Sequence, residues 1–117
     1  MKTILVVDDD ANIRLLLRDD LWEKGYNVIT AVDGDEAVVS FAEEHVDLVI
    51  LDIRMPKLNG IEVLKIIRGA KSDVPVIIYT ANPDDLEDLS PYGNTCKITK
   101  SSKLEELTNR VEKILNA

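Results

Sequence analysis

The segment from Val49 to Gly60, VILDIRMPKLNG, places one carboxylate at the end of an apolar run. Three aliphatic residues lead directly to Asp52, and Pro56 and the Asn59-Gly60 pair follow within eight positions. Val, Ile and Leu in a short run are typical of a buried β-strand, and Pro, Asn and Gly are typical of turns. The pattern therefore predicts a strand that ends on Asp52, with a loop directly after it.

Polar residues follow three further apolar runs in the same manner. Asp8, Asp9 and Asp10 come after the run ILVV, Thr80 comes after VIIY, and Lys100 comes after the weaker run TCKIT. In an open parallel sheet, ligands bind beyond the carboxyl ends of the strands. If the four runs are neighbouring strands, their carboxylates, hydroxyl and ammonium meet in one crevice.

This set of side chains suits a divalent cation and a phosphoryl group. Clustered carboxylates repel one another, and one of them is driven towards protonation unless a cation lies between them. One or two carboxylates, with water completing the shell, are the ligands that Mg²⁺ prefers. A carboxylate beside bound Mg²⁺ can attack phosphorus and form an acyl phosphate. The hydroxyl and the ammonium can then hold the phosphoryl oxygens.

The elements that must position these residues alternate between strands and helices. Apolar strands separated by helices predict a parallel sheet covered on both faces, and right-handed crossovers leave few topologies. We predict an α/β protein, a (βα)5 flavodoxin-like three-layer sandwich with strand order 2-1-3-4-5, as one domain over residues 1–117. The predicted strands are Ile4–Val7, Asn27–Ala31, Val46–Leu51, Val74–Tyr79 and Thr95–Thr99.

Five helices are predicted from apolar spacing and from capping residues. The first predicted helix ends near Gly25 and has inward residues Ile13, Leu16, Leu17 and Leu21. The second is opened by a capping box from Asp33 to Glu36 and has inward residues Ala37, Val38, Phe41 and Ala42. The third ends near Gly69 and has inward residues Ile61, Leu64 and Ile67. The fourth predicted helix is short, is capped by Asn82-Pro83 and is closed by Pro91. The last is opened by a capping box from Ser102 to Glu105 and has inward residues Leu104, Leu107, Val111 and Ile114.

Composition restricts the partners and the compartment. The chain has 22 acidic and 14 basic residues, a formal charge of −8, which argues against direct contact with nucleic acid. Cys96 is the one cysteine, so an internal disulfide is impossible and a reducing compartment is expected. The N-terminal apolar run is too short for a membrane span or a secretion signal. We predict a cytoplasmic protein that contacts neither membrane nor nucleic acid.

The motifs, taken together, identify a family. From ILVVDDD through VILDIRMPKLNGIEVL and VIIYTA to CKITK, the chain resembles the receiver domain of bacterial two-component response regulators, and is similar to chemotaxis regulators. The resemblance implies these roles: Asp52 is the phosphoacceptor, Asp8 and Asp9 form the acidic pocket with Asp9 the direct ligand of Mg²⁺ (or Mn²⁺), the backbone carbonyl of Arg54 is a further ligand, Thr80 is the switch hydroxyl, and Lys100 binds the phosphate.

The resemblance also implies a function. A sensor histidine kinase or a histidine phosphotransfer protein would donate the phosphoryl group, and the domain would signal to a downstream protein by changing conformation. The chain would not be an enzyme beyond promoting its own phosphorylation and dephosphorylation. Arg54 and Asn82 would flank the path of the attacking water and tune the phosphoryl lifetime.

Three features depart from the family pattern. Ser101 stands where the family usually has proline after the lysine, and a cis bond without proline costs roughly 2.5–4 kcal/mol. We therefore predict a trans Lys100-Ser101 bond, or a strained cis bond held by its surroundings. Lys97 stands where the family often has Tyr or Phe. The helix after Asn82 is short and acidic, which predicts a monomer, at least without phosphorylation.

Two other functions fit parts of the pattern. A binding module that no longer needs phosphate fits the loss of the aromatic residue and the proline, but not the retention of Asp9, Asp52, Thr80 and Lys100. An aspartate-dependent phosphohydrolase usually has a second aspartate where Arg54 stands. Taken alone, the aspartates after the first strand could be helix caps and Lys100 a surface residue. Trp22, Phe41 and Cys96 are predicted to pack in the core, and His45 to lie on the surface.

Overall fold

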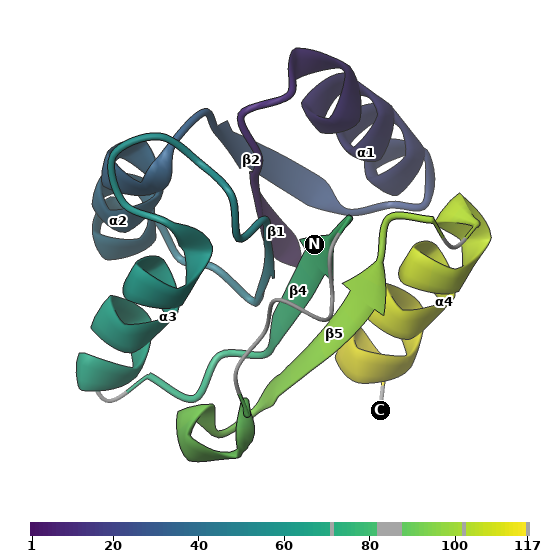
Figure 1. Cartoon of the computed structure of the whole chain (residues 1–117). Helices are drawn as coiled ribbons and strands as arrows, with labels where there is room; N and C mark the ends of the chain where they lie inside the picture. The colour runs from purple at the N-terminus through teal and green to yellow at the C-terminus, as the bar shows by residue number, and fades with distance from the viewer. Residues whose placement is uncertain (71, 82–87, 102, 117) are drawn as a thin grey trace.

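Five parallel strands form one sheet at the centre of the molecule (Figure 1). The computed structural model describes residues 1–70, 72–81, 88–101 and 103–116. Along the sheet the strand order is β2-β1-β3-β4-β5, so the predicted topology is confirmed. The strands are β1 (Thr3–Val7), β2 (Asn27–Ala31), β3 (Leu48–Leu51), β4 (Val76–Thr80) and β5 (Thr95–Thr99).

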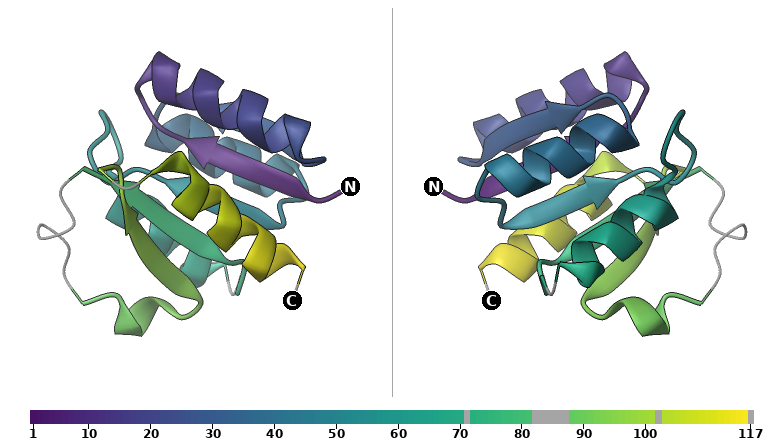
Figure 2. Two further views of the ribbon diagram at one scale, coloured as in Figure 1. Left: turned by 90° about the vertical axis from the view of Figure 1, so that its right-hand side faces the viewer. Right: turned by 90° about the vertical axis from the view of Figure 1, so that its left-hand side faces the viewer.

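Helices cover both faces of this sheet (Figure 2). One layer contains α1 (Ala11–Glu23) and α4 (Leu104–Leu115), and the other contains α2 (Gly34–Glu43) and α3 (Gly60–Gly69). A short 3-10 turn, η2 (Ser90–Tyr92), precedes β5. None of the helices in the described part of the chain is long and apolar enough to cross a membrane.

Strand β1 shows why its residues are apolar without interruption. Ile4 and Val6 pack with residues of α1 and α4, whereas Leu5 and Val7 pack with residues of α2 and α3. Successive side chains of a strand point to opposite faces, so a strand covered on both sides needs apolar residues at every position. This packing fixes the end of β1, and therefore the place of the carboxylates that follow it.

The limits of three strands differ slightly from prediction, and the first of these, β1, begins one residue early, at Thr3. Strand β3 begins at Leu48 rather than Val46, and β4 runs from Val76 to Thr80 rather than from Val74 to Tyr79. Val46 and Val74 are partly buried against the core although they precede the strands. Apolar residues that pack on the core without joining the sheet have the same sequence pattern as strand residues.

The predicted inner faces of two helices contain errors. Trp22 is 60% exposed and Leu16 is 49% exposed, so neither belongs to the core. Helix α1 buries only Leu17 and Leu21 fully, and Leu16 and Trp22 lie off that stripe on the helix surface. Ala42 of α2 is likewise exposed.

Phe41 and Cys96 pack against the two core clusters as predicted. His45 is exposed, also as predicted.

The N-cap predicted for α2 is confirmed, whereas the N-cap of α4 is Lys103 rather than the predicted Ser102. The side chain of Asp33 accepts a hydrogen bond from the Glu36 amide at 2.8 Å and caps α2. The helix predicted from Asn82 falls mainly outside the described residues, and Pro91 lies within η2. Ser102 is also outside them, and α4 has Lys103 as its N-cap without a side-chain capping bond.

Arg68, near the end of α3, ties together the loops at the edge of the sheet where β4 and β5 begin. It donates to five acceptors: the carbonyl oxygens of Ser72 (2.9 Å), Val74 (2.8 Å), Asn94 (2.9 Å) and Tyr92, and the hydroxyl of Thr95 (3.0 Å). The sequence gives no sign of this role for Arg68. Most of its acceptors are backbone groups, which leave no pattern in a sequence.

Candidate functional site

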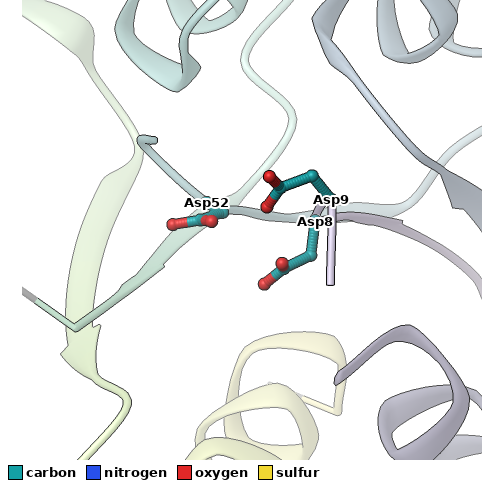
Figure 3. Close-up of side chains that lie close together, drawn as sticks. All are labelled: Asp8, Asp9 and Asp52. Carbon is teal, nitrogen blue, oxygen red and sulfur yellow. The ribbon is translucent and has the colours of Figure 1, made fainter. Parts of the chain in front are cut away.

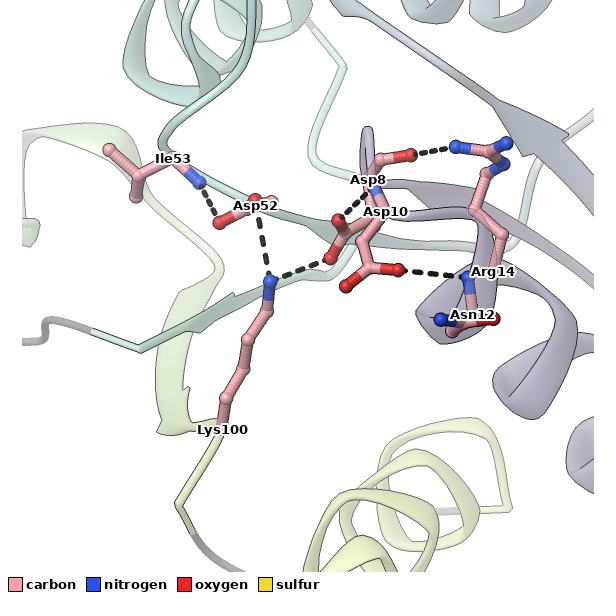
Figure 4. Close-up of polar contacts among 7 residues, drawn as sticks. All are labelled: Asp8, Asp10, Asn12, Arg14, Asp52, Ile53 and Lys100. Atoms are coloured by element: carbon pink, nitrogen blue, oxygen red, sulfur yellow. Dashed lines mark hydrogen bonds and ion pairs between the residues drawn. The ribbon is translucent and has the colours of Figure 1, made fainter.

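The carboxyl ends of the central strands bring the predicted residues together (Figure 4). Val7 and Leu51 are partners across β1 and β3, so Asp8 and Asp52 follow neighbouring strands at the same level. The Asp52 amide donates to the Val7 carbonyl at 2.9 Å. The sheet therefore holds both carboxylates at one edge.

The same edge continues across β4 and β5. Thr80 is the last residue of β4 and is 2% exposed. The Lys100 amide donates to the Thr80 carbonyl at 2.8 Å, directly after Thr80 and Thr99 pair across the strands. Strand pairing thus places Thr80 and Lys100 at the same edge of the sheet as the carboxylates.

Three carboxylates form a cluster at this edge (Figure 3). One carboxylate oxygen from each of Asp8, Asp9 and Asp52 lies within 4.8 Å of the other two. Asp8 is 2% exposed and Asp52 is 6% exposed, whereas Asp9 is exposed. The cluster therefore has a buried floor and one carboxylate in contact with water.

Lys100 is the cation that faces this floor. Its Nζ atom lies 2.8 Å from Oδ2 of Asp8 and 3.4 Å from Oδ2 of Asp52. Two backbone amides hold the other oxygens: Asp10 N–H donates to Oδ1 of Asp8 at 2.9 Å, and Ile53 N–H donates to Oδ1 of Asp52 at 2.8 Å. Both carboxylates are oriented before any ligand arrives.

The electrostatics of the site favour an added cation. Burial raises the pKa of the Asp52 carboxyl, the negative charge of Asp8 raises it further, and Lys100 only partly offsets these effects. Burial alone lowers the pKa of Lys100, but the carboxylates of Asp8 and Asp52 outweigh it and leave that pKa above its usual value. One ammonium thus compensates two buried carboxylates incompletely. A divalent cation would stabilise their ionised forms.

The connection from β3 to α3 is packed tightly beside the cluster. A Cβ atom on Gly60 would lie 2.2 Å from the backbone oxygen of Asp52, and one on Gly34 would lie 2.3 Å from the backbone oxygen of Leu58. Lys57, which has a positive φ of 67°, pairs with the helix cap Asp33 at 3.3 Å. These contacts fix the course of the loop that carries Arg54.

Most of the site residues predicted from the sequence lie at this edge of the sheet. Asp8, Asp9, Asp52 and Lys100 come together as expected, Thr80 lies at the adjoining strand end, and Arg54 follows Asp52 on the loop with its side chain exposed. Asn82 is outside the described residues. Three carboxylates open to water on one side provide the oxygen donors that suit Mg²⁺.

Two departures from the family pattern lie in strand β5 or directly after it. The described part of the chain contains no cis peptide bond, so the Lys100-Ser101 bond is trans as expected. Lys97 lies in β5 with its side chain exposed.

Comparison with known proteins identifies the family. Residues 4–112 match the model of the response regulator receiver domain. The chain belongs to this family. Receiver domains are the phosphoacceptor domains of response regulators in two-component signalling, so the resemblance inferred from the sequence is confirmed.

Curated relatives include longer transcriptional regulators. The chain is 40% identical over 116 residues to PhoP, the alkaline phosphatase synthesis transcriptional regulatory protein of Bacillus subtilis, covering 97% of this chain and 48% of PhoP. It is 42% identical over 114 residues to the probable transcriptional regulator ycf27 of Porphyridium aerugineum, covering 96% of this chain and 47% of that protein. The chain thus spans about half the length of these relatives.

Solved structures match over nearly the whole chain. The response regulator TrrA of Thermotoga maritima, in complex with Mg²⁺-BeF, has a TM-score of 0.88 at 44% identity, covering 97% of this chain and 99% of TrrA. The chemotaxis protein CheY4 of Vibrio cholerae has a TM-score of 0.88 at 29% identity, covering 97% and 98% of the two chains.

Proposed function

We propose that Asp52 is the residue on which this receiver domain accepts a phosphoryl group. The observation that carries the proposal is the surroundings of this carboxylate at the end of β3. Two other carboxylates have oxygens within 4.8 Å, and the Lys100 ammonium lies 3.4 Å away. A metal ion and a phosphoryl group both need such a setting, because each requires compensating charge at one oxygen cluster.

Mg²⁺ is the cation that we propose for the cluster, and Mn²⁺ is the substitute that its oxygen donors would also accept. Asp9 and Asp52 would bind it directly, Asp8 would support it from the buried floor, and the backbone carbonyl of Arg54 would complete the protein ligands. When bound, the ion would neutralise charge on the phosphoryl oxygens. TrrA, which is 44% identical, was crystallised with Mg²⁺ and the phosphoryl mimic BeF.

The chain's own groups would carry out the transfer. A carboxylate oxygen of Asp52 forms the new bond to phosphorus, while the bond from phosphorus to the donor breaks and its electron pair leaves with the donor. The ammonium of Lys100 and the hydroxyl of Thr80 then contact the phosphoryl oxygens. Lys100 is already beside Asp52, so little movement is required of it.

The partners follow from the same proposal. A sensor histidine kinase or a histidine phosphotransfer protein would be the donor, and a downstream protein would bind the phosphorylated form. The response regulator TrrA has been crystallised with the histidine kinase ThkA, which supports a donor of this class. We propose that residues 1–117 act as a single receiver domain in the cytoplasm, without direct contact to nucleic acid or membrane.

The proposal is tested by intact-mass spectrometry after incubation with acetyl phosphate, with and without Mg²⁺. We expect one phosphoryl adduct that requires Mg²⁺ and is lost in Asp52→Asn. The matched control is Asp19→Asn, which makes the same chemical change at an exposed position paired with Arg18 at 3.7 Å. That control should be labelled as the wild type is.

An adduct that persists in Asp52→Asn would place the phosphoacceptor elsewhere. If the wild type formed no adduct and bound no Mg²⁺, the phosphate-independent binding module would replace this proposal. Lys97 and Ser101, which depart from the family pattern, would then be signs of a phosphorylation site that has lost its use.

A further inference from the structure

Arg14, in the early part of α1, reaches back to the site from outside the carboxylate cluster (Figure 4). Its Nη1 atom donates a hydrogen bond to the backbone carbonyl oxygen of Asp8 at 2.8 Å. The donor and the acceptor are six residues apart, so this bond ties the helix to the end of β1. Hydrogen bonds from a charged donor are roughly twice as strong as those between neutral groups.

The acceptor belongs to the peptide group that joins Asp8 to Asp9. A peptide group is planar, so fixing its oxygen also fixes the direction in which the chain enters Asp9. The Asp8 side chain is held separately, by the Asp10 amide at 2.9 Å and by Lys100 at 2.8 Å. Asp9 is exposed, whereas Asp8 and Asp52, the other two carboxylates of the cluster, are buried.

From this geometry we infer that Arg14 is a positioning residue for the metal site. It holds the Asp8–Asp9 peptide so that the carboxylate of Asp9 remains directed towards Asp52. The inference rests on the proposed function, in which Asp9 binds Mg²⁺ directly. Partners that orient a metal ligand typically contribute about ten- to a hundredfold to metal affinity.

Charge and positioning predict opposite signs for the loss of Arg14. A guanidinium near a cation site repels the cation, so removing it for electrostatic reasons alone would tighten Mg²⁺ binding. Removing a residue that orients Asp9 would weaken it instead. The sign of the change therefore separates the two roles.

The experiment measures Mg²⁺ binding by isothermal titration calorimetry on the full chain. We expect the dissociation constant to rise about tenfold in Arg14→Gln. Arg14→Lys keeps the charge and one donor, so its loss should be smaller, about threefold. Arg18→Gln is the matched control, because this substitution removes the same charge. Arg18 lies one turn later on α1, and its side chain is 54% exposed. It should bind Mg²⁺ as tightly as the wild type or slightly more tightly.

Phosphorylation by acetyl phosphate gives a second readout. In Arg14→Gln the Mg²⁺ concentration for half-maximal rate should rise by the same factor, with the rate at saturating Mg²⁺ close to that of the wild type. Affinity equal to that of Arg18→Gln would overturn the inference. If Arg14→Gln does not fold, Arg14→Lys against Arg18→Lys decides the question in the same way. Absence of Mg²⁺ binding and of labelling in the wild type would instead overturn the proposed function, and the inference with it.

Discussion

The Asp52 carboxylate must be ionised to act, yet the fold makes ionisation unfavourable. Its side chain is nearly buried and lies beside Asp8, and both effects raise its pKa. The Lys100 ammonium lies 3.4 Å from Asp52 but also pairs with Asp8, so its positive charge is shared between the two carboxylates. Functional sites commonly reduce stability in this way.

Neutralising this residue should therefore stabilise the protein. We expect Asp52→Asn to raise the free energy of unfolding by about 1 kcal/mol at pH 7 in the absence of Mg²⁺. Because its folded-state pKa is raised, the contribution of Asp52 to stability is most favourable below the unfolded value near 3.8 and is lost as pH rises through the folded value. The advantage of Asp52→Asn should thus appear above pH 4 and vanish below it. Urea unfolding followed by circular dichroism in EDTA measures this.

Asp47, which lies just before β3, provides a control of opposite sign. Its Oδ2 atom accepts a hydrogen bond from the Thr3 amide at 2.8 Å, and this bond lowers its pKa. Its stabilisation is present above the unfolded value of 3.8 and is lost as pH falls through the lowered folded value. Asp47→Asn should destabilise the protein at pH 7. A less stable Asp52→Asn at pH 7 would contradict our account of the site.

The residues of the site differ in how far sequence could predict them. Asp8, Asp52 and Lys100 were predictable because each directly follows an apolar run, and parallel strands end at one edge of the sheet. Arg14 was not predictable, because its acceptor is a backbone carbonyl and an arginine on a helix surface is common. The prediction that Trp22 packs in the core is wrong, because α1 turns this side chain towards solvent.

At the scale of elements, the β3–α3 connection limits the geometry of the site most closely. Helix α3 begins at Gly60, whose amide donates to the Ile53 carbonyl at 2.9 Å, so the helix start lies against the residue after Asp52. Asn59 and Glu62 close this start with a reciprocal capping box. The connection therefore returns to the strand end that it left.

A side chain at Gly60 should disturb both the fold and the site. The added Cβ of Gly60→Ala would lie 2.2 Å from the Asp52 backbone oxygen and 2.8 Å from the Ile53 Cα, and neither backbone atom can move independently. We expect the free energy of unfolding to fall by about 2 kcal/mol and Mg²⁺ binding to weaken. Chemical denaturation and calorimetry measure the two effects.

Gly69, at the other end of the same helix, is the matched control. A Cβ there has no neighbour within 4 Å, so Gly69→Ala should stabilise the protein by up to about 1 kcal/mol through helix propensity alone. Equal effects of the two substitutions would show that close approach to Asp52 does not constrain the loop.

Strand existence was easier to predict from sequence than strand limits. Four apolar runs and the weaker run TCKIT correspond to five strands in the expected order, because a sheet covered on both faces requires apolar strands. Hydrogen bonding, rather than hydrophobicity, decides where a strand starts. Val46 and Val74 satisfy the apolar pattern and pack on the core, but the ladders begin at Leu48 and Val76.

At the scale of the whole molecule, the chain carries a formal charge of −8. Large net charge of one sign opposes association between identical copies. The most exposed apolar side chain of α1, Trp22, lies on the same side of the helix as Leu15, which is 49% exposed, seven residues earlier. For the α1 surfaces of two copies to associate, the apolar contact of this pair would have to overcome the charge repulsion.

We predict a monomer without phosphorylation. Sedimentation velocity at low micromolar concentration, with no phosphodonor, should give one species of 13.1 kDa at both low and physiological salt. Charges are screened beyond about 8 Å at physiological ionic strength, so repulsion alone acts only at close approach there. Weak association confined to 1 M salt should disappear in Trp22→Ser if the apolar pair of α1 drives it. A stable dimer at physiological salt would contradict the prediction. If Trp22→Ser left that dimer intact, its interface would have to lie away from the exposed pair of α1.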